Sequence, residues 1–182
     1  MESQKIDPKF NKYQNPKIGL IALASDYMIE KDFIKIIKDK EIDFFVNRIE
    51  CFNPLTKENL IKMSEKVTEV TKDILPDEKI DCVAYGCTSG TIAAGFDAIQ
   101  KKIKNAKPEA IVVTPSTASI KALKRLNIKK IAIFTPYSKK LKWCNNRKVN
   151  HLQVWIKQRV LSQRRRSKKE PVDISLSKSQ EW

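Results

Sequence analysis

Short apolar runs alternate along this chain with longer stretches in which apolar residues recur at helical spacing. Runs of that kind, bounded by turn residues, are typical of buried strands, and their alternation with helices indicates a parallel sheet. We expect strands over residues 17–24, 43–49, 80–85, 110–114 and 130–135. We expect helices over residues 29–38, from about 56 to 75, from 91 to 103 and from 116 to 126. The sequence therefore predicts an α/β fold of five βα units, with helices on both faces of a parallel sheet.

Polar residues follow each expected strand. In open α/β sheets, ligands bind outside the carboxyl ends of the strands. Those ends carry Ser25-Asp26, Asn53, Cys87-Thr88-Ser89, Thr114-Pro115-Ser116-Thr117 and Thr135-Pro136-Tyr137. A single serine or threonine at such a place is more often the N-cap of a helix than a catalytic residue. Several clusters at one sheet edge nevertheless favour a site for a small anion, held by hydroxyls and backbone amides.

The segment Gly86-Cys87-Thr88-Ser89-Gly90 joins the third expected strand to the helix that follows it. A thiol at such a turn lies beside free N–H groups, which bind anions and favour the thiolate form of a cysteine. The glycines on either side are expected to let a substrate approach the backbone. This arrangement favours a nucleophilic or proton-transferring thiolate that acts on a small carboxylate. The alternative is a buried structural cysteine, which is the usual state of a free cysteine.

The length of 182 residues predicts one domain with a substantial core. No apolar stretch approaches the roughly 20 residues that span a bilayer, and residues 1–17 lack the apolar segment of a secretory signal. Four cysteines without a CxxC pair indicate reduced thiols rather than zinc ligands or a redox motif. We therefore expect a cytoplasmic protein that has no membrane partner.

The net charge of +15 is concentrated near the C-terminus. Residues 139–182 contain 13 Lys and Arg against 3 Asp and Glu, whereas the rest of the chain contains 23 against 18.

The single histidine, His151, also lies in that basic segment, which excludes histidine-based triads, dyads and metal sites from the body of the protein. The four glycines form neither a GxGxxG motif nor a P-loop, so nucleotide binding has little support.

Five segments, in order, resemble the aspartate/glutamate racemase superfamily: IGLIALASDYMIEKDF (18–33), NPLTKENL (53–60), AYGCTSGT (84–91), VVTPSTASIKAL (112–123) and IAIFTPY (131–137). Within it they are most similar to the branch of maleate cis-trans isomerase, arylmalonate decarboxylase and the ectoine-utilisation protein EutA. The segments NPLTKENL and GCTSG point to the last of these. The resemblance implies a cofactor-independent enzyme of two similar flavodoxin-like α/β lobes, each of which contributes one cysteine to the cleft between them.

By motif, the resemblance assigns the catalytic cysteine of the first lobe to Cys87. It implies that the substrate is bound by Asp26, Thr88, Ser89, Thr114, Ser116, Thr117 and Tyr137. The implied reaction is attack on, or proton transfer to, the carbon beside a carboxylate of a small carboxylate or dicarboxylate, without a metal. Racemisation, cis-trans isomerisation, decarboxylation and ectoine-pathway chemistry stay open, as does a homo-oligomer. Cys51 and Cys82 match no motif, and Cys82 is expected to be a core residue.

After Tyr137 the resemblance stops, and Cys144 does not match the second cysteine motif of the family. Back-translated from Lys142 and shifted by one nucleotide, the tail resembles the helix that follows TPY in the family. A run of adenines encoding Lys139-Lys140 would be a natural place for such a shift. We therefore expect a polar segment 1–16, a racemase-like lobe 17–138 and a basic tail 139–182 that is disordered or a frameshift product, with impaired activity.

The alternative for this tail is a genuine basic appendage. Its arginine and lysine clusters would then make the chain a nucleic-acid-binding module on a non-catalytic α/β scaffold. Short basic runs are usually solvated, and this one has no recognised motif. We therefore do not expect a nucleic acid as partner.

Overall fold

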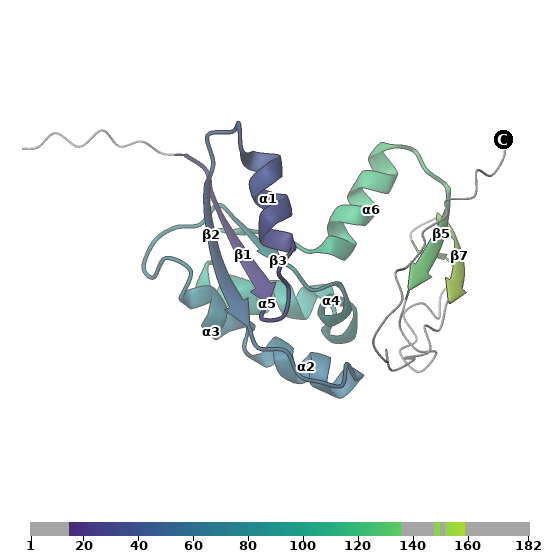
Figure 1. The fold of residues 1–182 in the computed structure, drawn as a ribbon, viewed down its shortest axis with the longest axis horizontal. Coiled ribbons are helices and arrows are strands. Elements are labelled where there is room, and N and C mark those ends of the chain that lie inside the picture. The colour runs from purple at the N-terminus through teal and green to yellow at the C-terminus, as the bar shows by residue number, and fades with distance from the viewer. Residues whose placement is uncertain (1–14, 136–147, 150–151, 159–182) are drawn as a thin grey trace, which may run out of the picture.

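The computed structural model describes residues 15–135, 148–149 and 152–158. Its centre is a four-stranded, fully parallel sheet of β1 (Lys17–Leu23), β2 (Asp43–Ile49), β3 (Cys82–Tyr85) and β4 (Ile111–Val113), shown in Figure 1. The strands lie in the order β2-β1-β3-β4. This order is that of flavodoxin-like sheets, in which the chain starts in the interior of the sheet and moves outward on both sides. The predicted α/β fold is therefore confirmed.

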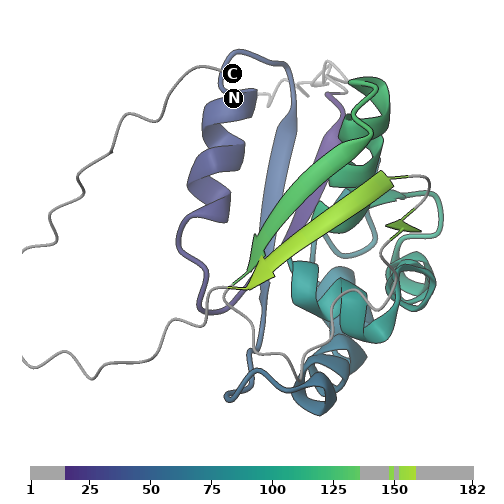
Figure 2. The same cartoon turned by 90° about the vertical axis from the view of Figure 1, so that its right-hand side faces the viewer.

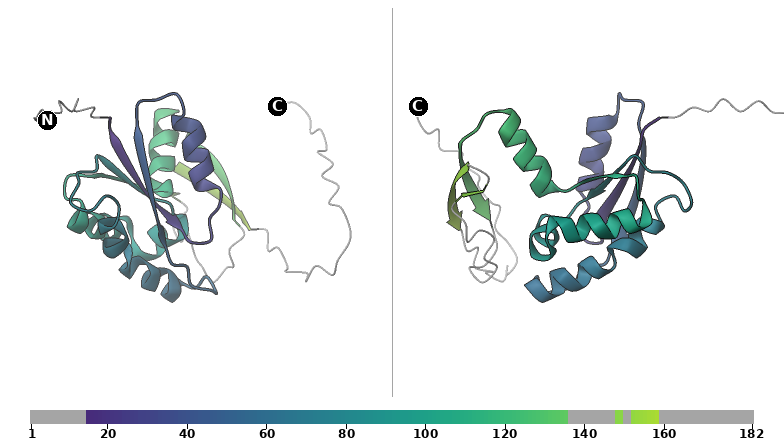
Figure 3. Two further views of the ribbon diagram at one scale, coloured as in Figure 1. Left: turned by 60° about the vertical axis from the view of Figure 1, so that its left-hand side comes forward. Right: turned by 180° about the vertical axis from the view of Figure 1, so that it is seen from behind.

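Helices cover both faces of this sheet, as Figure 3 shows from two sides. The helix α1 (Ile29–Ile37) lies on one face, where Phe33 stacks on Phe44 of β2 with ring centroids 5.4 Å apart. The opposite face carries α2 (Lys57–Glu65), α3 (Val67–Lys72), α4 (Thr88–Ala94) and α5 (Phe96–Ala106), which enclose the larger core. Because side chains alternate along a strand, Ala84 of β3 points to the α1 side, whereas Val83 and Tyr85 point into the larger core.

Two of the expected helices are each divided into two. The one from about 56 to 75 is interrupted at Lys66, between α2 and α3. The one expected over 91–103 starts earlier, at Thr88, and is interrupted at Gly95 between α4 and α5. Gly95 has a φ of +87°, a conformation that side chains other than glycine's rarely adopt. Helical periodicity continues through both interruptions, which is why the pattern alone predicts single helices.

The fifth expected strand forms, but not in the expected place. The strand β5 (Lys130–Thr135) has the predicted bounds, yet it pairs in parallel with β7 (Leu152–Gln158) instead of extending the main sheet beside β4. With β6 (Lys148–Val149) these strands form a second sheet beyond α6 (Pro115–Arg125), and Figure 2 shows β5 and β7 side by side. Among the described residues, β4 is therefore the last strand on its side of the main sheet.

One consequence is that β4 ends the main sheet with apolar residues uncovered. Ile111 of β4 is 64 % exposed, and Leu126, just after α6, is 68 % exposed.

The boundary at residue 138 and the nature of the tail stay predictions, since most of the tail lies outside the described residues. Among the helices of the described ranges, none combines the length and apolar character that crossing a membrane needs.

Candidate active site

Cys87 lies at the carboxyl end of β3 and is the N-cap residue of α4. Its backbone is still extended there, with φ −119° and ψ 106°, so the side chain folds back over the first turn of the helix. The Sγ atom accepts a hydrogen bond from the Gly90 N–H at 3.1 Å and lies 3.5 Å from the Ser89 hydroxyl oxygen. A cap usually carries an oxygen of Ser, Thr, Asp or Asn. Here the Cys87 sulfur occupies the N-cap position and accepts the hydrogen bond from the Gly90 N–H.

The thiol is nevertheless enclosed, because Cys87 is only 2 % exposed and belongs to the larger core. The two neighbouring glycines do not open the backbone to a ligand, as the sequence suggested. A Cβ on Gly86 would come within 2.8 Å of Ile29 Cδ1, and one on Gly90 within 2.6 Å of the Tyr85 hydroxyl. Both glycines therefore make room for the protein's own atoms.

Tyr85 is a residue of this site that the sequence analysis did not identify. Its ring is fully buried, and its hydroxyl has no hydrogen-bond partner among the described residues. Burial raises the pKa of Tyr85 far above its usual value, and the nearby Cys87 raises it further. The signal was present in the sequence: residues two apart on a strand face the same side, so a tyrosine two residues before Cys87 points the same way.

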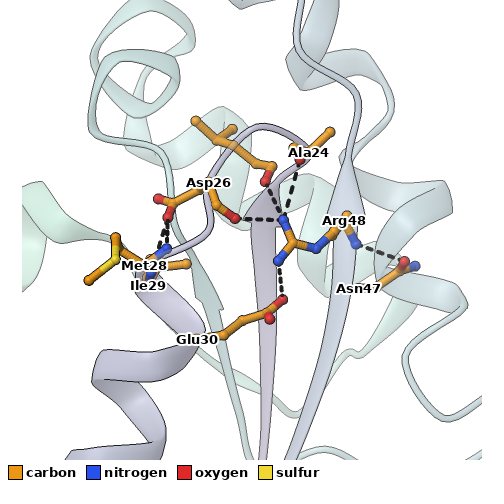
Figure 4. Close-up of polar contacts among 8 residues, drawn as sticks. Ala24, Asp26, Met28, Ile29, Glu30, Asn47 and Arg48 are labelled. Carbon is orange, nitrogen blue, oxygen red and sulfur yellow. Dashed lines mark hydrogen bonds and ion pairs between the residues drawn. The ribbon is translucent and has the colours of Figure 1, made fainter.

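Asp26 lies at the end of β1 and caps the first turn of α1, as Figure 4 shows. One carboxylate oxygen, Oδ1, accepts hydrogen bonds from the backbone N–H groups of Met28 at 2.8 Å and Ile29 at 3.0 Å. These bonds, and to a smaller extent the charge of Arg48, lower the pKa of Asp26. The carboxylate therefore has a structural task, and only its other oxygen is left for a polar substrate group.

Arg48 of β2 holds the loop that carries Asp26. Its Nη1 atom donates to the carbonyl oxygens of Asp26 at 2.6 Å and Leu23 at 3.0 Å, and its Nη2 atom forms an ion pair with Glu30 at 2.7 Å (Figure 4). One guanidinium thus ties the end of β1 to the start of α1. The sequence alone did not single out this arginine.

We expect Arg48→Met to lower the free energy of unfolding by about 1–2 kcal/mol, because hydrogen bonds from a charged donor to the carbonyls of Leu23, Ala24 and Asp26 are lost at a half-exposed position. Glu30→Gln, which removes only the ion pair, should cost less than about 0.5 kcal/mol. Urea unfolding monitored by circular dichroism measures both. Equal losses in the two variants would show that the ion pair, and not the carbonyl contacts, stabilises the loop.

The threonine and serine cluster after β4 is a helix cap. The Thr114 hydroxyl accepts from the Thr117 N–H at 3.3 Å, the Thr117 hydroxyl accepts from the Thr114 N–H at 3.0 Å, and the Ser116 hydroxyl lies 3.1 Å from that of Thr114. This reciprocal capping box starts α6. Thr114, Ser116 and Thr117 thus have the structural role that the sequence analysis gave as the frequent one, a helix cap. Binding a substrate would be a second role for them.

The predicted site residues fall into three groups. Ser89 lies with Cys87, Thr114 lies with Ser116 and Thr117, and Asp26 lies with Arg48, while Thr88 is exposed at the first position of α4. Tyr137 lies outside the described residues. Strand order brings the groups to one edge, because β3 lies between β1 and β4. Within residues 15–131, no hydrogen bond joins one group to another.

The other two described cysteines differ from Cys87. Cys51 follows β2 at the same edge, with its sulfur 3.7 Å from the Ser25 hydroxyl. Cys82 is the first residue of β3, and burial raises the pKa of its thiol, followed by the charge of Asp81. In the part of the chain that the structure describes, no three His, Cys, Asp or Glu side chains gather as metal ligands would.

A hollow of about 670 Å³ lies at the opposite edge of the sheet, away from Cys87. Its lining includes Lys107, a largely buried residue whose Nζ atom donates to the carbonyl oxygens of Leu75 at 2.7 Å and Glu78 at 2.8 Å. This lysine fixes the loop before β3. The hollow therefore lies at the amino-terminal edge of the sheet, whereas Cys87 and the other candidate site residues lie at the carboxyl edge.

No protein-family model and no curated protein matches this chain. Solved structures do. The maleate isomerase Iso from Pseudomonas putida superposes with a TM-score of 0.64 at 20 % identity, over 80 % of this chain and 63 % of that one. A cysteine-to-alanine variant of it with maleate gives 0.62 at 21 %, over 80 % and 62 %.

A third neighbour is a cysteine-to-serine mutant of the Nocardia farcinica maleate cis-trans isomerase with a covalently bound succinylcysteine intermediate. It superposes with a TM-score of 0.60 at 19 % identity, over 71 % of this chain and 56 % of that one. At such identities the likeness concerns the fold. The chain thus has the α/β fold of the maleate cis-trans isomerases and spans less than two thirds of their length.

Proposed function

We propose that this chain is one lobe of a cofactor-independent isomerase or racemase that acts through the Cys87 thiolate on a small dicarboxylate such as maleate. The observation that carries the proposal is the position of Cys87: its sulfur accepts an amide hydrogen bond at the carboxyl edge of a sheet with the maleate isomerase fold. Ligands of such sheets bind at that edge. The succinylcysteine in the Nocardia farcinica enzyme is an adduct of the kind that a cysteine nucleophile forms with this substrate.

The chemistry follows from the thiolate. Its lone pair would form a C–S bond to one alkene carbon of maleate, while the π electrons move to the other carbon and are stabilised through the adjacent carboxylate. A second group would protonate that carbon and give the succinyl adduct. Rotation about the resulting single bond, return of a proton to that group and expulsion of the thiolate would then give the trans acid, with every atom conserved. Thr88 and Ser89 are the proposed donors to the substrate carboxylate, and the exposure of Thr88 at the first position of α4 supports this residue in that role.

Two finer points belong to this proposal. An ectoine-derived acid is an alternative substrate, supported by the NPLTKENL and GCTSG segments. Loss of a second lobe would impair turnover, because the resemblance implies that each lobe contributes one cysteine to the cleft. The nucleic-acid-binding alternative gains no support, because the neighbours reported above are isomerases.

Alkylation of the two cysteines of β3 and its loop tests the proposal. We expect iodoacetamide to modify Cys87 at least about tenfold faster than Cys82 near pH 8, because burial raises the pKa of the Cys82 thiol, whereas the Cys87 sulfur accepts the Gly90 N–H. Exposure alone predicts the reverse order, since Cys87 is the more buried of the two. Tandem mass spectrometry of the intact 182-residue chain after brief labelling assigns each rate to its cysteine.

Maleate provides the second arm of this experiment. Added maleate should slow alkylation at Cys87 and leave Cys82 unchanged, because Cys87 lies at the proposed binding edge and Cys82 is the first residue of β3, at its other end. If Cys82 reacts first, Cys87 is a core cysteine and the proposed function fails. Cys87→Ser, which keeps an N-cap hydroxyl, serves as the labelling control.

A further inference from the structure

The Tyr85 hydroxyl is a polar group that the larger core encloses without using. Tyr85 is 0 % exposed, and its oxygen meets no hydrogen-bond partner among the described residues. A buried hydroxyl in that state destabilises the folded protein, and phenylalanine would fill the same space without the penalty. A functional reason for this hydroxyl would be a hydrogen bond that forms only when a neighbouring group changes its charge.

The geometry indicates which state that is. The position that a Cβ would take on Gly90 lies 2.6 Å from the Tyr85 oxygen and 3.0 Å from the Cys87 sulfur. Oxygen and sulfur thus both lie close to one point, and Met63 Cε of α2 lies 3.0 Å from it. Because Gly90 has no side chain, both polar atoms can lie close to this point beside the first turn of α4.

The charges around this point are few. The titratable groups that affect Tyr85 are Cys87 in the same turn and Cys51 after β2. From α2 the contact is the thioether of Met63, and the charged residues of that helix, Lys57, Glu58, Lys62 and Glu65, are exposed. Burial and the Cys87 charge both raise the pKa of Tyr85, so its hydroxyl keeps its proton when the thiol ionises.

We propose that Tyr85 is a positioning residue, whose hydroxyl donates a hydrogen bond to the Cys87 sulfur when this becomes a thiolate. The inference rests on the proposed function, since it concerns the same thiol. The Gly90 N–H and the Tyr85 O–H would then be two donors to one sulfur, from the helix and from the strand. Two donors fix the direction of the sulfur lone pair that attacks the substrate, and they favour the charged form.

The test compares Tyr85→Phe with the wild-type chain. The rate of Cys87 alkylation by iodoacetamide is followed from about pH 6 to about pH 10, a range that brackets the usual titration of a cysteine. Loss of a donor to the thiolate should move the midpoint of this profile up by about one pH unit. The thermal unfolding temperature should stay equal or rise, because the variant removes an unpartnered buried hydroxyl. Tyr27→Phe, the same change at an exposed tyrosine, is the matched control and should alter neither quantity.

Each outcome decides between the two roles of Tyr85. An upward midpoint with unimpaired stability establishes the positioning role, since a purely structural tyrosine would not move the profile. An unchanged midpoint overturns the inference. A marked loss of stability also overturns it, because the hydroxyl would then have a partner in the resting protein. Failure of the proposed function is distinguishable: it appears in the wild-type chain, as Cys87 reacting no faster than Cys82.

Discussion

Replacing Gly90 with alanine is expected to destabilise the protein by about 1–2 kcal/mol and to slow alkylation of Cys87 at least about tenfold. Alanine is favoured over glycine inside a helix by about 1 kcal/mol, so the isolated helix α4 would gain from the change. The added methyl group, however, would lie 2.6 Å from the Tyr85 oxygen and 3.0 Å from the Cys87 sulfur. Overpacking of a core costs about 1–3 kcal/mol. The tyrosine ring is fully buried and cannot swing away, so the cost should exceed the gain.

Combining Gly90→Ala with Tyr85→Phe identifies the atom responsible. Phenylalanine removes the oxygen at 2.6 Å, and the remaining close atom of another element, Met63 Cε, ends a flexible side chain that can move. The double variant should therefore recover most of the lost stability, with a coupling energy of about 1 kcal/mol or more in a double-mutant cycle. Denaturant unfolding of the four proteins measures it. Additive losses would mean that the methyl group collides with something other than the tyrosine.

Much of the fold was predictable because the decisive information is local. The bounds of β2 and β5 agree with the apolar runs, and those of β1, β4, α1 and α6 differ from the expected ranges by no more than one residue at either end. Apolar runs and turn residues fix such elements without reference to the rest of the chain. The pairing of β5 was not predictable in this way. Which strand becomes a neighbour depends on competition between β4 and a distant run in the tail, and periodicity carries no information about that competition.

In the candidate site, too, the sequence predicted what depends on local residues and missed what depends on packing. Cys87 was predictable, since the motif places it at a strand-to-helix turn, and the structure adds the hydrogen bond from Gly90. Arg48 and Tyr85 were missed because their significance lies in what surrounds them. Arg48 donates to three carbonyl oxygens at the end of β1 and in the loop after it, and the Tyr85 hydroxyl has no hydrogen-bond partner in the part of the chain that the structure describes. Contacts of that kind are set by packing between elements, which a single sequence does not reveal.

The 182-residue chain is expected to isomerise maleate at a rate at least about a hundredfold below that of the Pseudomonas putida maleate isomerase assayed beside it. A missing proton-transfer group costs about 10²–10⁴ in rate. Two groups that act on opposite faces of one carbon, each at about 3–3.5 Å, must lie roughly 7 Å apart. At the described edge the other thiol is Cys51, and β1 separates β2 from β3, which puts the two strand ends about 10 Å apart.

Proton NMR of maleate and fumarate over time measures this turnover, and Cys87→Ser provides the background rate. Cys87 should still be alkylated rapidly in the same preparation, because the hydrogen bond from the Gly90 N–H to its sulfur needs no second catalytic group. Rapid turnover that Cys87→Ser abolishes would contradict the expectation. The second group would then come from this chain or from another copy of it, and Cys144→Ser, at a position outside the described residues, would show whether that cysteine is the one.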